Sequence, residues 1–195
     1  MSQINATEPV GSDSRRREIL RAAARLFGTH GYAGTSMRDI AAAVGLLPGS
    51  LYYHFLSKEE LIEEIFIAGT EVLSTAVQTA IAPLSDPWAR LEQACVAHLE
   101  THLSASAVVT IITAESLKSP PALRAKLVAH RDRYEQIFVD LVAALDLPAE
   151  IDRSIYRLSL LSTLNAVDFW YRPGGRTLDD IARQIFRIYD HRNRA

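Results

Sequence analysis

The chain has 195 residues, of which 48% are hydrophobic and 23% charged, with a formal net charge of -2. This composition excludes a disordered or fibrous protein and leaves room for one core-forming domain, with or without a small attached module. Residues 1–58 carry seven basic and four acidic side chains, whereas residues 59–195 carry fourteen basic and nineteen acidic ones. The N-terminal end is therefore the basic one, as expected if only that end meets a polyanion.

The single cysteine, Cys95, excludes an intrachain disulfide and lies in an apolar helical pattern that is typical of a buried thiol. No apolar run approaches the roughly 20 residues that span a bilayer. The opening stretch MSQINATEPVGSDS lacks the charged start and hydrophobic middle of a signal peptide. We therefore expect a cytoplasmic protein with no membrane partner, and residues 1–13 are expected to form a disordered arm.

Apolar residues recur with a 3.6-residue period along most of the chain, and no stretch alternates with period two for long enough to make a strand. The expected fold class is therefore all-α. Caps and breakers predict helices, in chain order, over Ser14–His30, Ser36–Gly45, Pro48–His54, Ser57–Ile81, Pro87–Leu103, Ala107–Leu117, Pro121–Leu145, Glu150–Tyr171 and Leu178–Arg192.

Two short helices between Thr35 and His54, joined by a turn at Gly45, have the lengths and the spacing of a helix-turn-helix. In the second helix only Leu51 and Phe55 are firm apolar anchors, four residues apart, so the other face points outward. Such a helix fits a DNA major groove, where small first residues approach base edges and polar side chains reach phosphates. The alternative is that YYHF forms an aromatic hinge that packs this helix onto the next one.

The segment AARLFGTHGYAGTSMRDIAAAVGLLPGSLYYHFLSKEEL, residues 23–61, resembles the N-terminal domain of the tetracycline-repressor (TetR) family. The resemblance implies an N-terminal three-helix helix-turn-helix DNA-binding domain over residues 14–57 and a helical C-terminal ligand-binding and dimerisation domain over residues 58–195. It implies a homodimeric repressor that leaves a palindromic operator DNA when a small-molecule effector binds. The DNA-binding residues that it implies are Thr35, Ser36, Arg38, Pro48, Gly49, Ser50, Tyr52, Tyr53, His54 and Lys58, with Lys58 on a phosphate.

Three arginines before this segment, Arg15, Arg16 and Arg17, either add contacts to DNA or form a solvated tail. Farther along, apolar residues spaced by three and four predict a seam between the last two helices. Its members are Leu160, Leu164, Val167, Tyr171, Leu178, Ile181, Ile185 and Ile188. This seam is either a four-helix dimer interface or an ordinary intramolecular core.

The effector site is expected among the middle helices. The stretch ASAVVTIITAESLK mixes small and branched apolar residues with a few polar ones, as concave ligand sites do, although such a run is also typical of core. The segment WYRPGG at 170–175 resembles TetR-family regulators of sterol and acyl-coenzyme A degradation, which implies a hydrophobic acid or its thioester as effector. The candidate ligand-binding residues are His98, His102, Thr110, Thr113, Leu161, Asn165 and Phe169.

His98 and His102 lie four residues apart on one helical face, a spacing that a metal ion can bridge. HLETH is not the order of a zinc protease and offers no third ligand, so we interpret them as core histidines and expect neither metal nor cofactor. The chain has no glycine-rich phosphate loop and no Gly-x-Ser-x-Gly elbow. A regulator is therefore favoured over an enzyme, and the second alternative is a helical sensor without DNA binding.

Overall fold

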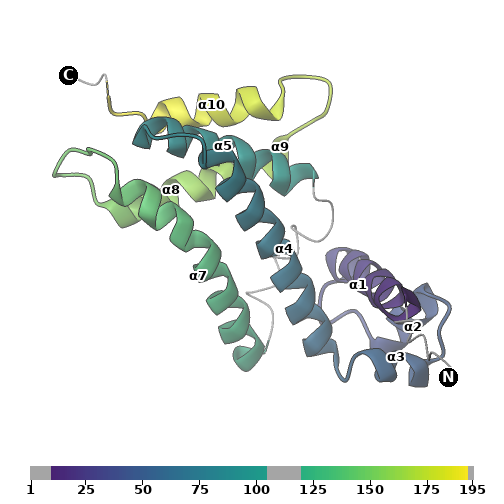
Figure 1. Ribbon diagram of the computed structural model, residues 1–195. Coiled ribbons are helices and arrows are strands. Elements are labelled where there is room, and N and C mark those ends of the chain that lie inside the picture. The colour runs from purple at the N-terminus through teal and green to yellow at the C-terminus, as the bar shows by residue number, and fades with distance from the viewer. Residues whose placement is uncertain (1–9, 105–119, 193–195) are drawn as a thin grey trace, which may run out of the picture.

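The computed structural model of the chain describes residues 10–104 and 120–192. Every regular element in these residues is a helix, so the all-α prediction is confirmed (Figure 1). The elements are α1 (Val10–His30), α2 (Met37–Ala43), α3 (Pro48–His54), α4 (Lys58–Ile81), α5 (Pro87–Ser104), α7 (Pro121–Ala143), α8 (Arg153–Asn165), α9 (Val167–Trp170) and α10 (Leu178–Tyr189). The helix predicted over 107–117 lies outside the described residues.

Helices α1, α2 and α3 form a small N-terminal unit, hereafter the head, beside the first turns of α4 (Figure 1). α1 begins at Val10, inside the stretch expected to be a disordered arm, and runs through Ser14, which is therefore not its N-cap. Its end follows the prediction, because Gly31 takes a left-handed φ of 74° directly after the last helical residue. The largest fully buried side chains of the head are Ile19, Phe27, Ile40, Leu51 and Phe55.

Local sequence explains the helix-turn-helix within the head. The Oγ atom of Ser36 accepts a hydrogen bond from the Asp39 amide at 3.2 Å, and the Asp39 carboxylate accepts one from the Ser36 amide at 2.8 Å. This reciprocal capping box starts α2 where the sequence predicted it. Gly45, at φ 66°, makes the turn that other residues rarely adopt, and Pro48 starts α3.

The long helix α4 joins the head to the remaining helices, hereafter the body (Figure 1). Its N-cap is Ser57, whose Oγ atom accepts a hydrogen bond from the Glu60 amide at 3.1 Å, as predicted. The buried side of α4 continues from Leu61 to Ile81 and packs on α5 and α7. One continuous helix therefore links α3 to the interior of the body.

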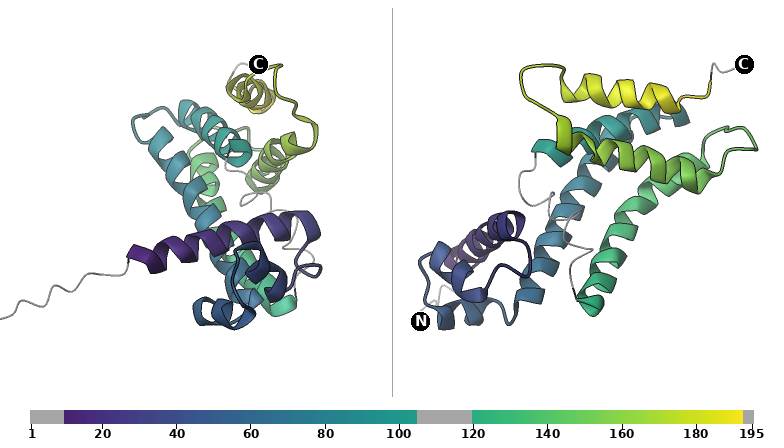
Figure 2. Two further views of the ribbon diagram at one scale, coloured as in Figure 1. Left: turned by 90° about the vertical axis from the view of Figure 1, so that its right-hand side faces the viewer. Right: turned by 180° about the vertical axis from the view of Figure 1, so that it is seen from behind.

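In the body, α5 contacts α4, α7, α8 and α10 and so lies at its centre (Figure 2). The single helix predicted over 150–171 is instead two, α8 and α9. α8 starts late because Asp152 is its N-cap and accepts a hydrogen bond from the Ile155 amide at 2.8 Å. α8 ends at Asn165 although no glycine or proline stands there, so periodicity alone does not locate the division.

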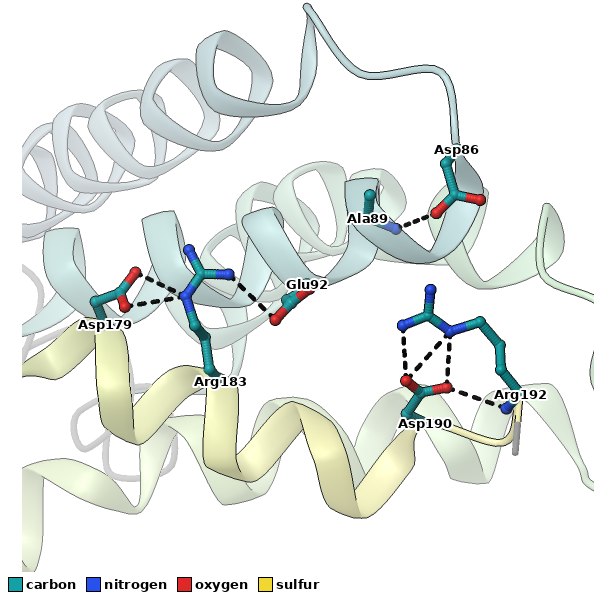
Figure 3. A network of polar contacts seen from close by, with 7 residues as sticks. All are labelled: Asp86, Ala89, Glu92, Asp179, Arg183, Asp190 and Arg192. Carbon is teal, nitrogen blue, oxygen red and sulfur yellow. Dashed lines mark hydrogen bonds and ion pairs between the residues drawn. The ribbon is translucent and has the colours of Figure 1, made fainter. Parts of the chain in front are cut away.

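α10 packs on α5 and is joined to it by one surface ion pair, which a second pair within α10 extends (Figure 3). Arg183 Nη1 donates to Glu92 of α5 at 3.1 Å, and Arg183 Nε donates to Asp179 at 2.9 Å (Figure 3). Beneath them the rings of Trp88 and Phe186 meet edge to face, with centroids 6.4 Å apart. These contacts fix the last helix across the top of the body.

The seam predicted between the last two helices is largely intramolecular core. Leu160, Leu164 and Val167 are 0% exposed, and Ile181 and Ile185 are also buried against the rest of the body. The intramolecular alternative fits these five residues, whereas Ile188, another member of the predicted seam, is 63% exposed, and the dimer interface stays a prediction. The spacing of three and four predicted a packed seam correctly but could not identify the partner helix.

Candidate nucleic-acid interface and effector domain

The outward face of α3 is polar and accessible. Leu51 and Phe55 are 0% exposed and anchor the helix, whereas Tyr53 is 88% exposed and Tyr52 49%. The residues of the first turn are exposed as well: Pro48, Gly49 and Ser50. The alternative that these tyrosines pack α3 onto α4 therefore fails.

A shallow recess of about 450 Å³ lies between the start of α2 and α3. Its rim contains the exposed side chains of Ser36, Arg38 and Tyr52, together with Lys58. The lining of this recess thus includes five of the ten residues that the resemblance implied for DNA binding, since Thr35 also lines it. The Tyr52 phenol and the Arg38 guanidinium group can donate to a phosphate here, whereas the Asp39 carboxylate also lines the recess and accepts a hydrogen bond from the Ser36 hydroxyl at 2.6 Å.

Thr35 and Lys58 have partners within the protein. Thr35 is 3% exposed, and its Oγ1 atom donates to the carbonyl groups of Leu26 and Gly31. Lys58 Nζ donates to the Tyr32 carbonyl at 2.6 Å and to the Thr35 carbonyl at 3.0 Å, and it lies 4.0 Å from the centre of the Tyr32 ring. These groups hold the loop between α1 and α2 onto α4, and the DNA contacts expected of both residues stay predictions.

The Tyr32 hydroxyl adds a second link between this loop and α4 by donating to the Glu59 carboxylate. Burial, reinforced by the neighbouring carboxylate, raises the pKa of the Tyr32 phenol well above its usual range. The hydrogen bond from Tyr32 lowers the pKa of Glu59. Glu59 is therefore ionised at neutral pH and keeps the link closed.

Arg16, which lies in α1, links this helix to α3 and to α4. Its Nη1 atom donates to the carbonyl of His54, the last residue of α3, at 2.6 Å, and its Nη2 atom pairs with Glu64. The guanidinium carbon also lies 4.1 Å from the centre of the Phe55 ring. Arg16 thus braces the recognition helix, a role that neither the tail interpretation nor the DNA-contact interpretation anticipated. Arg15 pairs with Glu18 of its own helix at 2.6 Å.

His54 closes the polar face at the end of α3. It is half-buried, and its ring meets the Tyr53 ring edge to face, with centroids 5.7 Å apart. Its backbone carbonyl is the acceptor for Arg16, so the residue contributes to the brace through its main chain. Its position at the edge of the face leaves the first turn of α3 and Tyr53 as exposed parts of this surface.

In the body, a buried polar cluster joins α5, α7 and α8. His98 is 2% exposed; its Nδ1 atom lies 2.6 Å from the Tyr134 hydroxyl and its Nε2 atom 3.1 Å from Asn165 Oδ1. The amide oxygen only accepts, so Nε2 carries the proton and Nδ1 accepts from Tyr134. Sequence reasoning missed Tyr134, because its place in an apolar pattern looked like ordinary core.

His102 stacks on His98, with ring centroids 5.7 Å apart and planes 8° from parallel. Burial, together with the neighbouring His102, lowers the pKa of His98 to about 4. Burial also lowers the pKa of His102, against the opposing effect of Asp168. Both rings are therefore neutral near pH 7, which agrees with the interpretation as core histidines.

The other candidate ligand-binding residues differ in their exposure to solvent. Leu161 is buried and lies in α8 on the same side as Asn165, whereas Phe169 is 83% exposed and does not line the interior. Phe169 thus lies at the surface of α9, and its role in ligand binding stays a prediction. Thr110 and Thr113 lie outside the described residues.

Two further expectations concern chemistry. Cys95 is fully buried, and burial raises the pKa of its thiol well above the usual range, so the prediction of a structural thiol is confirmed. Within residues 10–104 and 120–192, no three His, Cys, Asp or Glu side chains gather in a way that could hold a metal ion. No helix in the same ranges is long and apolar enough to cross a bilayer.

An exposed apolar face lies on α8, α9 and α10, of which sequence reasoning had named only Ile188, in the predicted seam, and Phe169, as a candidate ligand-binding residue. It consists of Ile155, Leu158, Phe169, Trp170 and Ile188, which are between 45% and 83% exposed. A recess of about 560 Å³ opens beside it, lined by residues that include Trp170, Tyr171, Arg172, Arg176 and Ile188. The signal was present in the sequence, since both faces of α8 are partly apolar, but the pattern singled out the buried face.

Comparison with known proteins gives matches along both parts of the chain. Residues 19–65 match the bacterial regulatory proteins of the tetR family, and residues 84–189 match the tetracyclin repressor-like C-terminal domain. The HTH-type transcriptional repressor KstR2 of Mycobacterium tuberculosis (strain ATCC 25618 / H37Rv) is 31% identical, over 90% of this chain and 91% of that protein. KstR2 of Rhodococcus jostii (strain RHA1) is 30% identical, over 96% and 95%.

Solved structures agree with these matches. AibR, in complex with isovaleryl coenzyme A and operator DNA, has a TM-score of 0.76 at 28% identity, covering 87% of this chain and 94% of that chain. KstR2 of Mycobacterium tuberculosis, a ketosteroid transcriptional regulator, has a TM-score of 0.74 at 27% identity, covering 96% and 94%. These proteins are regulators, which decides against the enzyme and against the sensor without a DNA-binding domain. The chain therefore belongs to the TetR family of helix-turn-helix transcriptional regulators.

Proposed function

We propose that the protein is a homodimeric repressor that binds a palindromic operator and releases it when a hydrophobic acid, or its coenzyme A thioester, occupies the body. The observation that carries the proposal is the accessible polar face of α3, held by the buried anchors Leu51 and Phe55. The relatives named as repressors support the direction of regulation.

At the operator, the first turn of α3 lies against base edges and the recess beside it receives a phosphate. Ser50 is the residue nearest the bases, because it is small and exposed at the start of the recognition helix. Ser36, Arg38 and Tyr52 surround the phosphate from three sides. Tyr53, at 88% exposed, reaches a neighbouring phosphate through its hydroxyl. Thr35 and Lys58 act indirectly by fixing the loop that carries Ser36.

A second copy of the chain covers the exposed apolar face of α8, α9 and α10. Five large apolar side chains on these three helices, including Leu158 and Phe169 at 45% and 83% exposed, are what an interaction surface presents. A two-fold axis would bring the same face of each copy together and build a four-helix interface. The heads would then lie at opposite ends of the dimer and meet successive major grooves.

The effector is a hydrophobic acid or its coenzyme A thioester. The AibR complex with isovaleryl coenzyme A supports the thioester, because that protein shares the fold along both domains. Arg172 and Arg176 line the recess between α9 and α10 and offer two cations for phosphate groups.

Release reaches the head through α4. Glu63 of α4 pairs with Lys126 of α7 at 2.8 Å and lies 3.5 Å from His130, while the next residue, Glu64, pairs with Arg16. One turn of α4 is thus tied to the body on one side and to the recognition helix on the other. A shift of α7 that moves this turn also moves α3 through Arg16. A hundredfold loss of operator affinity requires about 2.7 kcal/mol of differential effector affinity between the two arrangements.

The proposal is tested by selecting duplexes from a random DNA pool with the full-length protein and measuring the complex by analytical ultracentrifugation. We expect an inverted repeat with half-sites one helical turn apart, about 34–36 Å, bound by an even number of chains. Leu158→Asp should give a monomer with reduced operator affinity, and the exposed Val72→Asp on α4 is the matched control. Enrichment of no sequence, or of a site without symmetry, would contradict the proposal.

A further inference from the structure

The first turn of α3 offers unusual chemistry for reading DNA. The helix has the sequence PGSLYYH, which contains no Arg, Lys, Asn, Gln, Asp or Glu. Those side chains make most hydrogen-bonded contacts to base edges in the major groove. At the start of the helix, Ser50 supplies the single polar side chain. Hydrogen bonds from side chains of this turn therefore carry little sequence information, and discrimination there needs another kind of contact.

Leu47, the N-cap residue of α3, supplies an apolar side chain at this place. It is 76% exposed, while the next two residues, Pro48 and Gly49, are exposed and too short to shield it. Its backbone is fixed, because its carbonyl accepts hydrogen bonds from the Ser50 amide at 2.9 Å and from the Leu51 amide at 3.3 Å. The leucine side chain is thus held at the leading end of the recognition helix.

We propose that Leu47 reads the 5-methyl group of a thymine in each operator half-site. The inference rests on the proposed binding of operator DNA by α3. A single exposed leucine is ordinary on a protein surface, but residues at the start of a recognition helix face base edges when the helix docks. The thymine methyl is the one apolar group that the four bases present in the major groove. An apolar side chain at this position therefore selects thymine over cytosine and over the purines.

The chain contains a matched control in Leu56. This leucine is 80% exposed, lies just past the other end of α3, and has its backbone held by the Glu60 carboxylate at 2.7 Å. It has the same side chain, similar exposure and a similarly fixed main chain, but it does not lead the helix into the groove. An effect of Leu47 that arises from apolar exposure alone should appear equally at Leu56.

The experiment uses the full-length protein and a duplex that this protein selects from a random pool. Each thymine is replaced in turn by deoxyuridine, which removes only the methyl group, and affinity is measured by fluorescence anisotropy. We expect one symmetric pair of thymines at which each lost methyl lowers affinity about fourfold. Leu47→Ala should bind the thymine and deoxyuridine duplexes equally, whereas Leu56→Ala should keep the fourfold difference.

Two further measurements separate this role from damage to the fold. Leu47→Ala should leave the melting temperature and the salt dependence of binding unchanged, because the residue is exposed and contacts no phosphate. A wild-type protein that ignores every methyl group, or a Leu47→Ala protein that keeps the same sensitive thymines, would overturn the inference while leaving operator binding intact. A protein that selects no duplex at all would instead overturn the proposed function.

Discussion

The Arg16 brace of the head and the His98 cluster of the body join helices with polar groups of opposite kinds. In the head, Arg16 and Glu64 form a charged pair whose side chains are 35% and 32% exposed. In the body, a neutral His98 lies between Tyr134 and Asn165 and is 2% exposed. Partly exposed charged pairs stabilise a fold weakly and are screened by salt. A buried neutral network loses stability when any one of its hydrogen-bonding partners is removed, because a buried polar group is then left unsatisfied. Added salt should therefore weaken the Arg16–Glu64 pair, whereas acid should destabilise the His98 cluster.

The largest expected effect is a loss of DNA binding by the head that leaves the body unchanged. Ser50→Glu places a carboxylate on the face of α3 that meets DNA, so we expect operator affinity to fall more than a hundredfold through repulsion from the phosphates. Because Ser50 is exposed, the melting temperature and the binding of effectors to the body should not change. Gel-shift titration and thermal melting measure both, with Ser50→Ala as the control. A Ser50→Glu protein that still shifts the operator would remove α3 from the groove.

Acid should destabilise the body through His98. The unfolded chain takes up a proton here near the ordinary pKa of 6.5, whereas the folded chain does so only near a pKa of about 4. The unfolded state therefore binds more protons across this window, and the free energy of unfolding falls as the pH drops through it. Between pH 7 and pH 5 we expect His98 to account for a loss of about 2 kcal/mol.

Urea unfolding at the two pH values, followed by circular dichroism, measures this loss. His98→Gln should reduce the pH dependence and leave the smaller share that belongs to His102, whose pKa is also lowered by burial. His30, which is exposed on α1, provides the control through His30→Gln. An unchanged pH dependence in His98→Gln would show that the buried ring does not titrate as the structure implies.

Arg16 should affect DNA binding more than it affects stability. Arg16→Met removes the brace on the His54 carbonyl and the pair with Glu64, so α3 loses a fixed position. We expect operator affinity to fall about fivefold, while the free energy of unfolding changes by less than about 1 kcal/mol because the pair is partly exposed. Arg15→Met, which breaks only a pair within α1, is the control. Equal effects of the two variants would mean that Arg16 braces nothing.

The smallest effect distinguishes two basic residues around one recess. Lys58 is occupied by the carbonyls of Tyr32 and Thr35, whereas Arg38 is exposed on the rim. Arg38→Met should reduce the slope of log affinity against log salt by about one unit, because one phosphate contact is lost. Lys58→Met should leave that slope unchanged and lower the melting temperature of the head. A reduced slope in Lys58→Met would restore the phosphate role that the resemblance implied.

These residues show what the sequence could predict. The capping box at Ser36, the turn at Gly45 and the anchors of α3 are local signals, and the structure has each of them where it was expected. Partners far apart in the chain could not be predicted in the same way. Arg16 and Glu64 are separated by 48 positions, and His98 and Asn165 by 67, so only packing brings them together.

The apolar residues of α8 show a second limit of prediction from the sequence. Spacing of three and four predicted an apolar stripe on α8 correctly, but Leu160 and Leu164 face their own chain while Ile155 and Leu158 face outward. Both pairs obey helical periodicity, and no local signal distinguishes a core side from a partner side. The sequence also could not show that Lys58 is used internally, because the carbonyls it binds belong to a loop whose path depends on the packing of α1 on α4.

The central claim, that an effector in the body controls the head, is tested most directly by one titration. Operator affinity is measured by fluorescence anisotropy at increasing isovaleryl coenzyme A and longer acyl thioesters, while tryptophan fluorescence reports occupancy at Trp170, which lines the recess beside α10. We predict that at least one thioester saturates the protein and lowers operator affinity about a hundredfold, equivalent to about 2.7 kcal/mol of coupling. Thioesters that saturate the tryptophan signal and leave operator affinity unchanged would contradict the account.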